Sequence, residues 1–323
     1  MTTPRLSIGI PTVDRLGYLR ESVASAQAQR IADLEILIGD DGDSLELGQW
    51  ARQTAADDRR VRYLKAPRKL GLAGMWNFLA DSAEGGFLAL IGDDDRLLAE
   101  FAERLLQQAA PTVSVVFSNH YLIDDTGRLL SEASQEITRR YGRAELHSGR
   151  LNSAATAVWR NSIPMSSCIV RTSDVRRLRF KADINTPEIE LFARLCLEAN
   201  GFVFVPEYLA EYRTHVRSET ARGLTLDRLA EYLEPIDVPA DVEATKRQCM
   251  ARLLAAGVAI RVDRGDLAGA RRLVASRYYG AGLTSIAQRL SLGLPDRLAR
   301  PAYAAFCRLK NFAGGRLRTA ASR

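Results

Sequence analysis

The segment Phe87-Leu-Ala-Leu-Ile-Gly-Asp-Asp-Asp95 decides the fold, because an apolar strand runs directly into three consecutive carboxylates. Adjacent carboxylates repel one another, so a protein leaves them together only on a solvated turn or around a cation. Alternate side chains of an extended Asp-Asp-Asp can converge on one divalent ion and on the phosphates that it carries. Taken alone, the segment leaves both interpretations open, the solvated turn and the metal site.

Apolar strands alternate with helices on both sides of this segment. We expect strands over residues 5–11, 34–39, 61–64, 87–91 and 113–118, and helices over 17–29, 44–57, 74–83 and 98–108. This alternation is typical of βαβ units and predicts an α/β fold with a mostly parallel central sheet flanked by helices. Ligands of such sheets bind outside the carboxyl ends of the strands.

A second acidic cluster, Asp40-Asp41-Gly42-Asp43, follows the strand over 34–39. The two clusters are therefore expected on one rim of the sheet, which is the pattern of a binding site. An Asp at a strand end can accept hydrogen bonds from a nucleobase N–H or a ribose hydroxyl, or it can belong to a helix cap formed by Asp43 or Ser44. No GxGxxG and no Walker A sequence follows the first strand, so dinucleotide and P-loop sites have no anchor.

The second half of the chain changes character twice. Residues 125–153 are polar and irregular and predict loops with an edge hairpin, and an amphipathic helix follows over 188–199 with a strand over 202–205. Beyond about residue 223 the pattern is wholly helical, over 226–236, 240–260, 266–277 and 281–290. A helical C-terminal extension is therefore expected.

Composition excludes several classes of protein. The chain has 323 residues, of which 46% are hydrophobic and 26% charged, so it buries a full core and is neither disordered nor a disulfide-stapled miniprotein. Four cysteines without a CxxC and three histidines leave carboxylates as the main ligands for any metal, which favours Mg²⁺ or Mn²⁺. No apolar run approaches the ~20 residues of a membrane span, and the N-terminus lacks a signal-peptide pattern, so we expect a cytoplasmic protein.

Charge is distributed unevenly along the chain. Residues 1–221 hold 27 Lys/Arg against 30 Asp/Glu, whereas residues 222–323 hold 18 against 9. Residues 291–323 carry seven basic residues and one acid, interleaved with leucines and aromatic residues. A basic amphipathic segment of this kind predicts peripheral contact with an anionic membrane, at the inner face of the cell membrane, and the alternative is a helical cap with solvated arginines.

Six motifs in this order resemble family 2 glycosyltransferases with the GT-A fold. They are Pro11-Thr12-Val13-Asp14-Arg15, Glu35-Ile-Leu-Ile-Gly-Asp-Asp-Gly-Asp-Ser44, Lys69-Leu-Gly-Leu-Ala-Gly-Met-Trp-Asn77, Gly92-Asp93-Asp94-Asp95, Thr186-Pro-Glu-Ile-Glu-Leu-Phe-Ala-Arg194 and Tyr212-Arg213-Thr214-His215. The resemblance covers about residues 5–218. It implies a glycosyltransferase domain over 1–222, with a nucleotide-sugar half over 1–118 and an acceptor half over 119–222, and a basic helical region over 223–323.

The resemblance also implies roles for single residues. Asp41 would read the base, Pro11, Thr12 and Asp14 would pack on base and ribose, Lys69, Gly71 and Asn77 would lie near ribose and diphosphate, and Asp93 would contact ribose and sugar. Asp94 would be the main metal ligand, Asp95 would complete the cluster, and His215 would close over the metal or diphosphate. Glu188 would be the catalytic base, Glu190 is expected on the solvated helix face, and Arg194 and Arg213 are further candidates.

The implied activity is inverting, metal-dependent transfer of a sugar from a nucleoside-diphosphate sugar to a hydroxyl. Acceptors of the family include glycans, lipid-linked sugars and secondary metabolites, which points to cell-surface polysaccharide biosynthesis and not to nucleic acid. Two alternatives stand beside it: a non-catalytic carbohydrate- or protein-binding relic of the fold, and a sugar-nucleotide nucleotidyltransferase. The second lacks support, because the first turn is Pro11-Thr12-Val13-Asp14 and not a glycine-rich loop.

Overall fold

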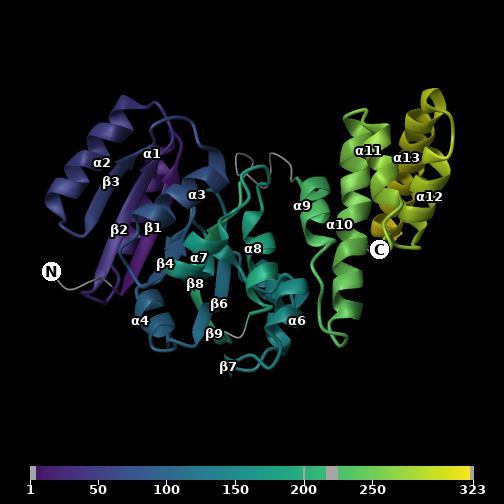
Figure 1. The fold of residues 1–323 in the computed structure, drawn as a ribbon. Helices are drawn as coiled ribbons and strands as arrows, with labels where there is room; N and C mark the ends of the chain where they lie inside the picture. The colour runs from purple at the N-terminus through teal and green to yellow at the C-terminus, as the bar shows by residue number, and fades with distance from the viewer. Residues whose placement is uncertain (1–4, 199–200, 216–224, 321–323) are drawn as a thin grey trace. The chain divides into compact units, whose positions relative to one another are not determined.

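The computed structural model describes residues 5–198, 201–215 and 225–320, with side chains described as far as residue 308. The chain divides into two units, Met1–Leu224 and Thr225–Arg323. Figure 1 shows the first as a sheet covered by helices and the second as helices alone. The division falls two residues from the boundary expected from the sequence.

One sheet of nine strands organises the described part of the first unit, in the order β3-β2-β1-β4-β8-β6-β9-β5, with β7 paired to β9. The strands are β1 (Leu6–Thr12), β2 (Leu34–Asp40), β3 (Val61–Lys65), β4 (Phe87–Leu90), β5 (Arg96–Leu97), β6 (Val113–Ile123), β7 (Gly149–Arg150), β8 (Cys168–Arg171) and β9 (Gly201–Arg213). Strands β1 to β4 pair in parallel, as expected. Strand β8 runs antiparallel to both β4 and β6, so antiparallel strands interrupt a sheet whose longest pairings, β1 with β2 and β6 with β9, are parallel.

Helices cover both faces of this sheet (Figure 1). They are α1 (Leu16–Gln27), α2 (Leu45–Asp57), α3 (Gly71–Ser82), α4 (Phe101–Leu106), α5 (Ser131–Arg140), α6 (Ala154–Trp159), α7 (Thr172–Leu178) and α8 (Pro187–Leu195). Helices α1, α2 and α4 bury Leu19, Leu47 and Phe101 in one core with the strands. Helix α3 lies so close to the strands that a side chain at Gly39 would meet Leu79 at 3.0 Å.

Helix α5 lies in the stretch for which the sequence predicted loops. Its buried residues are Ser134 and Thr138, so the face toward the sheet is polar and shows no apolar period. The Ser134 hydroxyl accepts the Leu122 backbone N–H at 2.8 Å, which ties the helix to β6. That prediction was wrong because hydrogen bonds, and not apolar side chains, dock the helix.

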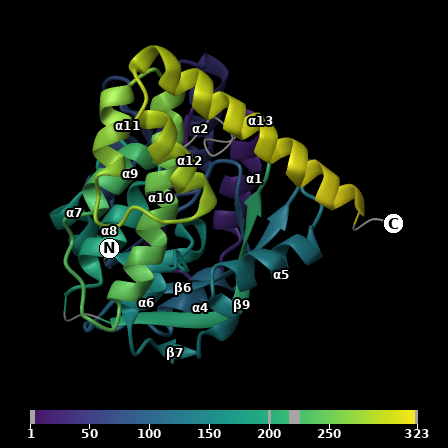
Figure 2. The same ribbon diagram turned by 90° about the vertical axis from the view of Figure 1, so that its right-hand side faces the viewer.

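The second unit is helical, as the sequence predicted. It contains α9 (Leu226–Leu233), α10 (Glu243–Asp263), α11 (Leu267–Val274), α12 (Leu283–Leu292) and α13 (Asp296–Ala320). Figure 2 shows α13 as one continuous rod that extends past the other helices of this unit. Among the helices in the described ranges, none combines the length and the hydropathy that a membrane span requires.

Candidate active site

The acidic turn over residues 92–95 follows the carboxyl end of β4, and Arg15 holds it from the neighbouring β1 turn. The buried Asp93 carboxylate accepts the Thr12 hydroxyl at 2.7 Å and two N–H groups of the Arg15 guanidinium. Arg15 Nη1 also donates to Asp94 Oδ2 at 2.9 Å. Burial raises the pKa of Asp93 to about 6, although the Arg15 charge favours the ionised form. Arg15 therefore offsets much of the repulsion within the turn.

Arg15 was not among the candidate residues of the sequence analysis. It ends the Pro-Thr-Val-Asp-Arg motif, so its position next to a predicted ligand turn was the available signal. Arg15 contacts Asp93 and Asp94, which lie 78 and 79 residues further along the chain, and no local sequence pattern predicts these contacts.

Asp95 points into the protein and not toward a ligand. Its carboxylate accepts the Ser166 hydroxyl at 2.5 Å and the Arg213 backbone N–H at 3.0 Å. Burial, and then the charge of Asp94, raises the pKa of Asp95. With both oxygens engaged by internal donors, Asp95 is a structural anchor of the turn, and its expected place in the metal cluster is not supported.

Arg213 is also structural. Its side chain is 1% exposed, donates to the Asp94 carbonyl oxygen at 2.8 Å and forms an ion pair with Glu21 at 2.6 Å. The Arg213 guanidinium therefore fixes the backbone of the acidic turn. Arg213, one of the further candidates from the sequence, thus supports the acidic turn through its backbone.

Asp94 and His215 are the two expected metal ligands that the structure brings together. His215 Nε2 and Asp94 Oδ2 form a hydrogen bond at 2.8 Å, and the same oxygen accepts Arg15 Nη1 at 2.9 Å, so a metal ion held here would replace these contacts. A carboxylate and an imidazole suit Mn²⁺, and Mg²⁺ is commonly held by one or two carboxylates with substrate phosphates and waters completing the shell. Within the described residues no group of three His, Cys, Asp or Glu side chains forms a ready metal site, so the remaining ligands would come from substrate and water.

Gly92 gives the acidic turn its shape. A Cβ at this position would overlap Asp94 Oδ1 and would lie 3.1 Å from Asp95 Oδ2. The absence of a side chain therefore leaves room for the Asp94 carboxylate to stand beside the backbone. A carboxylate at position 92 would compete for the same space.

The second acidic cluster organises two loops. Asp41 accepts the backbone N–H groups of Leu70 and Gly71 at 2.8 and 2.9 Å, and its own carbonyl accepts the Lys69 ammonium at 2.5 Å. Gly71 has a φ of +69°, a conformation that glycine adopts without strain. Asp41 thus begins α3 as a cap, and only its remaining lone pairs are available to a base.

Asp14 ties the β1 turn to the same loop. Its Oδ1 accepts the N–H groups of Asp43 and Ser44 at 2.9 and 2.8 Å, and its φ of +54° is unusual for a non-glycine residue. Pro11 and Thr12 end β1, and Val13 separates them from Asp14. The residues expected around base and ribose therefore lie close together, except for Asn77.

Asn77 faces away from this rim. Its amide nitrogen donates to the Phe180 carbonyl and its oxygen accepts the Phe180 N–H, both at 2.9 Å. Both ends of the amide are used in joining α3 to the loop after α7. The expected ribose contact is not supported, and Asn77 is a structural tie.

The two glutamates of α8 have different surroundings. Glu190 is 2% exposed and pairs with Arg194 at 2.7 Å, and Arg194 also donates to the carbonyl of Leu178. Glu190 is therefore a buried ion pair and not the solvated residue that the sequence predicted. Glu188 is half-buried, and among the described residues no cation pairs with it. Burial raises the pKa of the Glu188 carboxyl to about 7.

One short segment connects Glu188 to the acidic turn. Ser166 binds Asp95, and the charge of Glu188 contributes, after burial, to raising the pKa of the Cys168 thiol two residues later. Glu188 and the acidic turn therefore approach the same stretch from different elements. Thr186 Oγ1, two residues before Glu188, is a buried group without a hydrogen-bond partner among the described residues.

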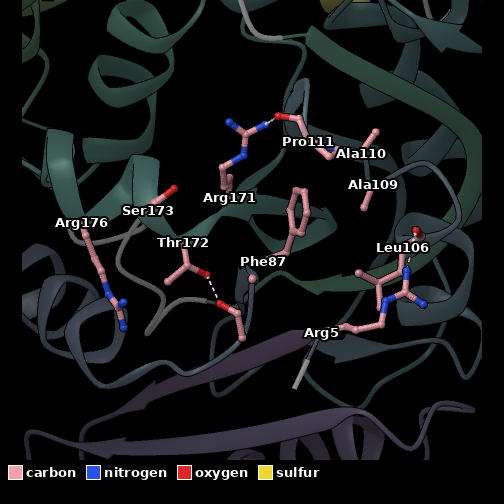
Figure 3. Close-up of a pocket in the computed structure, with 12 residues that line it drawn as sticks. Arg5, Phe87, Leu106, Ala109, Ala110, Pro111, Arg171, Thr172, Ser173 and Arg176 are labelled. Carbon is pink, nitrogen blue, oxygen red and sulfur yellow. Dashed lines mark hydrogen bonds between the residues drawn. The ribbon is translucent and has the colours of Figure 1, made fainter. Parts of the chain in front are cut away.

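A separate cavity of about 600 Å³ lies at the amino ends of the strands, away from the acidic turn at their carboxyl ends (Figure 3). Arg5 and Phe87 line it at the amino ends of β1 and β4, with Arg171 and Arg176 beside them. Arg171 donates to the Pro111 carbonyl at 2.5 Å and Arg176 to the Ala80 carbonyl at 2.8 Å. These arginines cap backbone carbonyls, and none of the candidate residues lines this cavity.

Comparison with known proteins supplies relatives for this arrangement. The family model described as Glycosyl transferase family 2 matches residues 7–165. A GalNAc(5)-diNAcBac-PP-undecaprenol beta-1,3-glucosyltransferase of Campylobacter jejuni is 36% identical over 132 residues, which are 41% of this chain and 42% of the relative. The chain therefore matches about two fifths of the length of that protein.

Two solved structures share the fold. S. aureus TarS 1-349 in complex with UDP-GlcNAc has a TM-score of 0.65 and 13% identity, covering 94% of this chain and 92% of that one. The mannosyltransferase PcManGT from Pyrobaculum calidifontis, in complex with GDP-Man and Mn²⁺, has a TM-score of 0.58 and 15% identity, covering 94% and 87%. At these identities the likeness concerns the fold alone.

Proposed function

Because residues 7–165 belong to glycosyl transferase family 2, we propose that this chain transfers a sugar from a nucleoside-diphosphate sugar to an acceptor hydroxyl. The transfer inverts the anomeric centre, with Glu188 as the general base. The observation that carries the proposal is the contrast on α8, where Glu190 is neutralised by Arg194 and Glu188 is left with a pKa of about 7.

A base with this pKa suits the reaction. General bases work best when their pKa lies near the operating pH, because they are then both ionised and able to hold a proton. The Glu188 carboxylate would take the proton of the acceptor hydroxyl as that oxygen attacks the anomeric carbon. The bond to the diphosphate breaks in the same displacement, so one carboxylate suffices and no second nucleophilic carboxylate is required.

The acidic turn would bind the donor. Asp93 is fully buried and both of its oxygens already accept from Thr12 and Arg15, so a sugar or ribose hydroxyl would have to share these oxygens with them. The exposed Lys69 side chain lies beside Asp41, where base and diphosphate would approach. Asp94 and His215 would hold a Mg²⁺ or Mn²⁺ ion, which when bound neutralises charge on the leaving diphosphate. A complex of a structural neighbour with Mn²⁺ supports the choice of metal.

The relatives indicate which donor and acceptor classes to test first. Structural neighbours are bound to UDP-GlcNAc and to GDP-Man, so uridine and guanosine donors are the first to test. The Campylobacter relative is named for an acceptor on undecaprenyl diphosphate, which supports a lipid-linked glycan as acceptor here.

The test is release of nucleoside diphosphate from a panel of UDP-, GDP- and dTDP-sugars, with Mn²⁺ or Mg²⁺ and with short lipid-linked saccharides as acceptors. We expect release from one class of donor, dependent on metal and stimulated by acceptor. The matched control is the Glu188→Gln protein, which should still be stabilised by the same donor against heat. Donor binding without turnover under all conditions would favour a non-catalytic binding protein instead.

A further inference from the structure

Helix α12 has its apolar side facing water. Leu283, Ile286 and Leu290 are 78%, 49% and 70% exposed, and their i, i+3, i+7 spacing places them on one face. Leu294, in the turn after α12, and Leu298, in the first turn of α13, are the next exposed leucines along the chain, at 38% and 48%. We call these five side chains, Leu283, Ile286, Leu290, Leu294 and Leu298, the apolar row.

The buried face of the same helix is largely polar. Its buried residues are Ser285, Gln288 and Ser291, with Leu292 at the end of the helix as the apolar member. The Gln288 amide donates to the Ala255 carbonyl at 2.9 Å and the Tyr303 hydroxyl at 3.0 Å. The ordinary arrangement of a surface helix is therefore inverted. An inverted helix is expected where the outer face meets an apolar phase and not bulk water.

The row is also unusual within this protein. The described residues include nine exposed large hydrophobic side chains, and five of them fall within residues 283–298. Single exposed hydrophobic residues are normal on soluble proteins, whereas a cluster marks an interaction surface. The other four, Val13, Leu45, Leu129 and Leu197, are dispersed along the chain.

The charge around the row is strongly positive. Residues 267–323 contain eleven Lys/Arg and one acidic residue, Asp296, which pairs with Arg271 at 2.7 Å. Arg289 lies over the Tyr279 ring and Arg300 donates to the Asp263 carbonyl at 2.8 Å, contacts that leave both charges uncancelled. Arg297 stands on the exposed surface next to Leu298.

We infer that the apolar row docks on an anionic lipid bilayer. The five side chains would enter the boundary between headgroups and acyl chains, and the surrounding arginines would meet lipid phosphates. A second copy of this chain is a poorer occupant, because a symmetric contact would bring two such basic surfaces together. The inference deepens the proposed function, since a lipid-linked acceptor resides in that bilayer, but its test needs no sugar transfer.

The experiment is co-sedimentation of the full chain with vesicles of phosphatidylcholine alone or with about 30 mol% phosphatidylglycerol. The test variant carries Leu283→Gln, Ile286→Gln and Leu290→Gln together, since glutamine keeps helix propensity. The matched control is Leu45→Gln, which changes a side chain of 79% exposure in the first unit. Circular dichroism and the unfolding midpoint establish that each protein is folded.

We expect the wild-type chain and the control to bind anionic vesicles at low salt, and far less to neutral ones. Each leucine or isoleucine fully moved from water to the acyl region is worth roughly tenfold in partitioning. Three side chains that enter to about half their depth therefore contribute about 30-fold, and the triple variant should bind more weakly by at least this factor. Arg297→Gln should lower binding about fivefold at low salt and less at high salt. Equal binding by the triple variant overturns the inference, as does a wild-type dimer that the triple variant converts to monomer. Failure of vesicle binding with intact sugar transfer would refute only this inference.

Discussion

Exchanging each glutamate of α8 for glutamine should give opposite results. Glu188→Gln keeps size and hydrogen bonding but cannot accept a proton, and loss of a general base costs about 10²–10⁴-fold in rate. We expect kcat to fall in this range with donor affinity nearly unchanged, since Glu188 acts on the acceptor. Glu190→Gln should leave kcat within about threefold, because Glu190 is engaged by Arg194.

Glu188→Gln should stabilise the folded chain even though it slows the reaction. The folded-state pKa of Glu188 is raised from its ordinary value of 4.5 to about 7, which corresponds to roughly 3 kcal/mol against the charged form. Below pH 4.5 both states are protonated and no penalty exists. As pH rises toward 7 the unfolded state ionises first, so folding loses stability until the folded carboxyl ionises too.

The glutamine variant carries no such penalty. Its unfolding free energy should exceed that of wild type by roughly 1 kcal/mol near pH 5.5 and about 3 kcal/mol above pH 8. Glu190→Gln should instead lose about 1–3 kcal/mol, because Arg194 loses its buried partner.

Urea unfolding near pH 5.5 and above pH 8 measures the unfolding free energies of wild type and the two variants. Initial rates measure their kcat values. The wild-type rate should also fall about tenfold per pH unit below 7, and this limb should vanish in Glu188→Gln. A crippled Glu190→Gln beside a mild Glu188→Gln would show that the motif register is wrong. A Glu188→Gln protein that is less stable than wild type at pH 8 would refute the burial argument.

Three further outcomes are expected. Asp94→Ala should abolish turnover with little change in unfolding midpoint, and an excess of chelator should do the same to wild type; full activity in either case contradicts a metal held by Asp94. Gly92→Ala should raise the Mn²⁺ concentration for half-maximal activity by about tenfold or more, since its Cβ displaces the Asp94 carboxylate, whereas Gly86→Ala, with no contact closer than 3.9 Å, should not. Asn77→Ala should lower the unfolding free energy by about 1–2 kcal/mol with an unchanged KM for donor; a KM effect alone would restore the ribose contact.

The sequence was sufficient for the parts of the fold that follow local rules. Strands β1, β2 and β4 are apolar runs that end in turn residues, so their elements and the shared rim of the two acidic clusters were predictable. The orientation of β8 was not, because a strand of four residues has no feature that distinguishes parallel from antiparallel pairing. Fold class and helical extension were predicted and the family comparison agrees with them.

Single side chains were harder to place when their partners lie far along the chain. The Asn77 partner, Phe180, is 103 residues away, and nothing local shows that the amide is already used. The pairing of Glu190 with Arg194 is an i, i+4 pair and was available from the sequence, but its burial was not.

The Asp95 carboxylate joins three parts of the chain that lie far apart in the sequence. Ser166 and Arg213 lie 71 and 118 residues away from it, and each satisfies one of its oxygens. Losing the Ser166 hydroxyl after the carboxylate has gone removes an interaction that no longer exists, so the two losses should not add in a double-mutant cycle. In homologues, residues 95 and 166 are therefore expected to change together. The contact with Asp95 through the Arg213 backbone N–H places no constraint on the side chain at position 213.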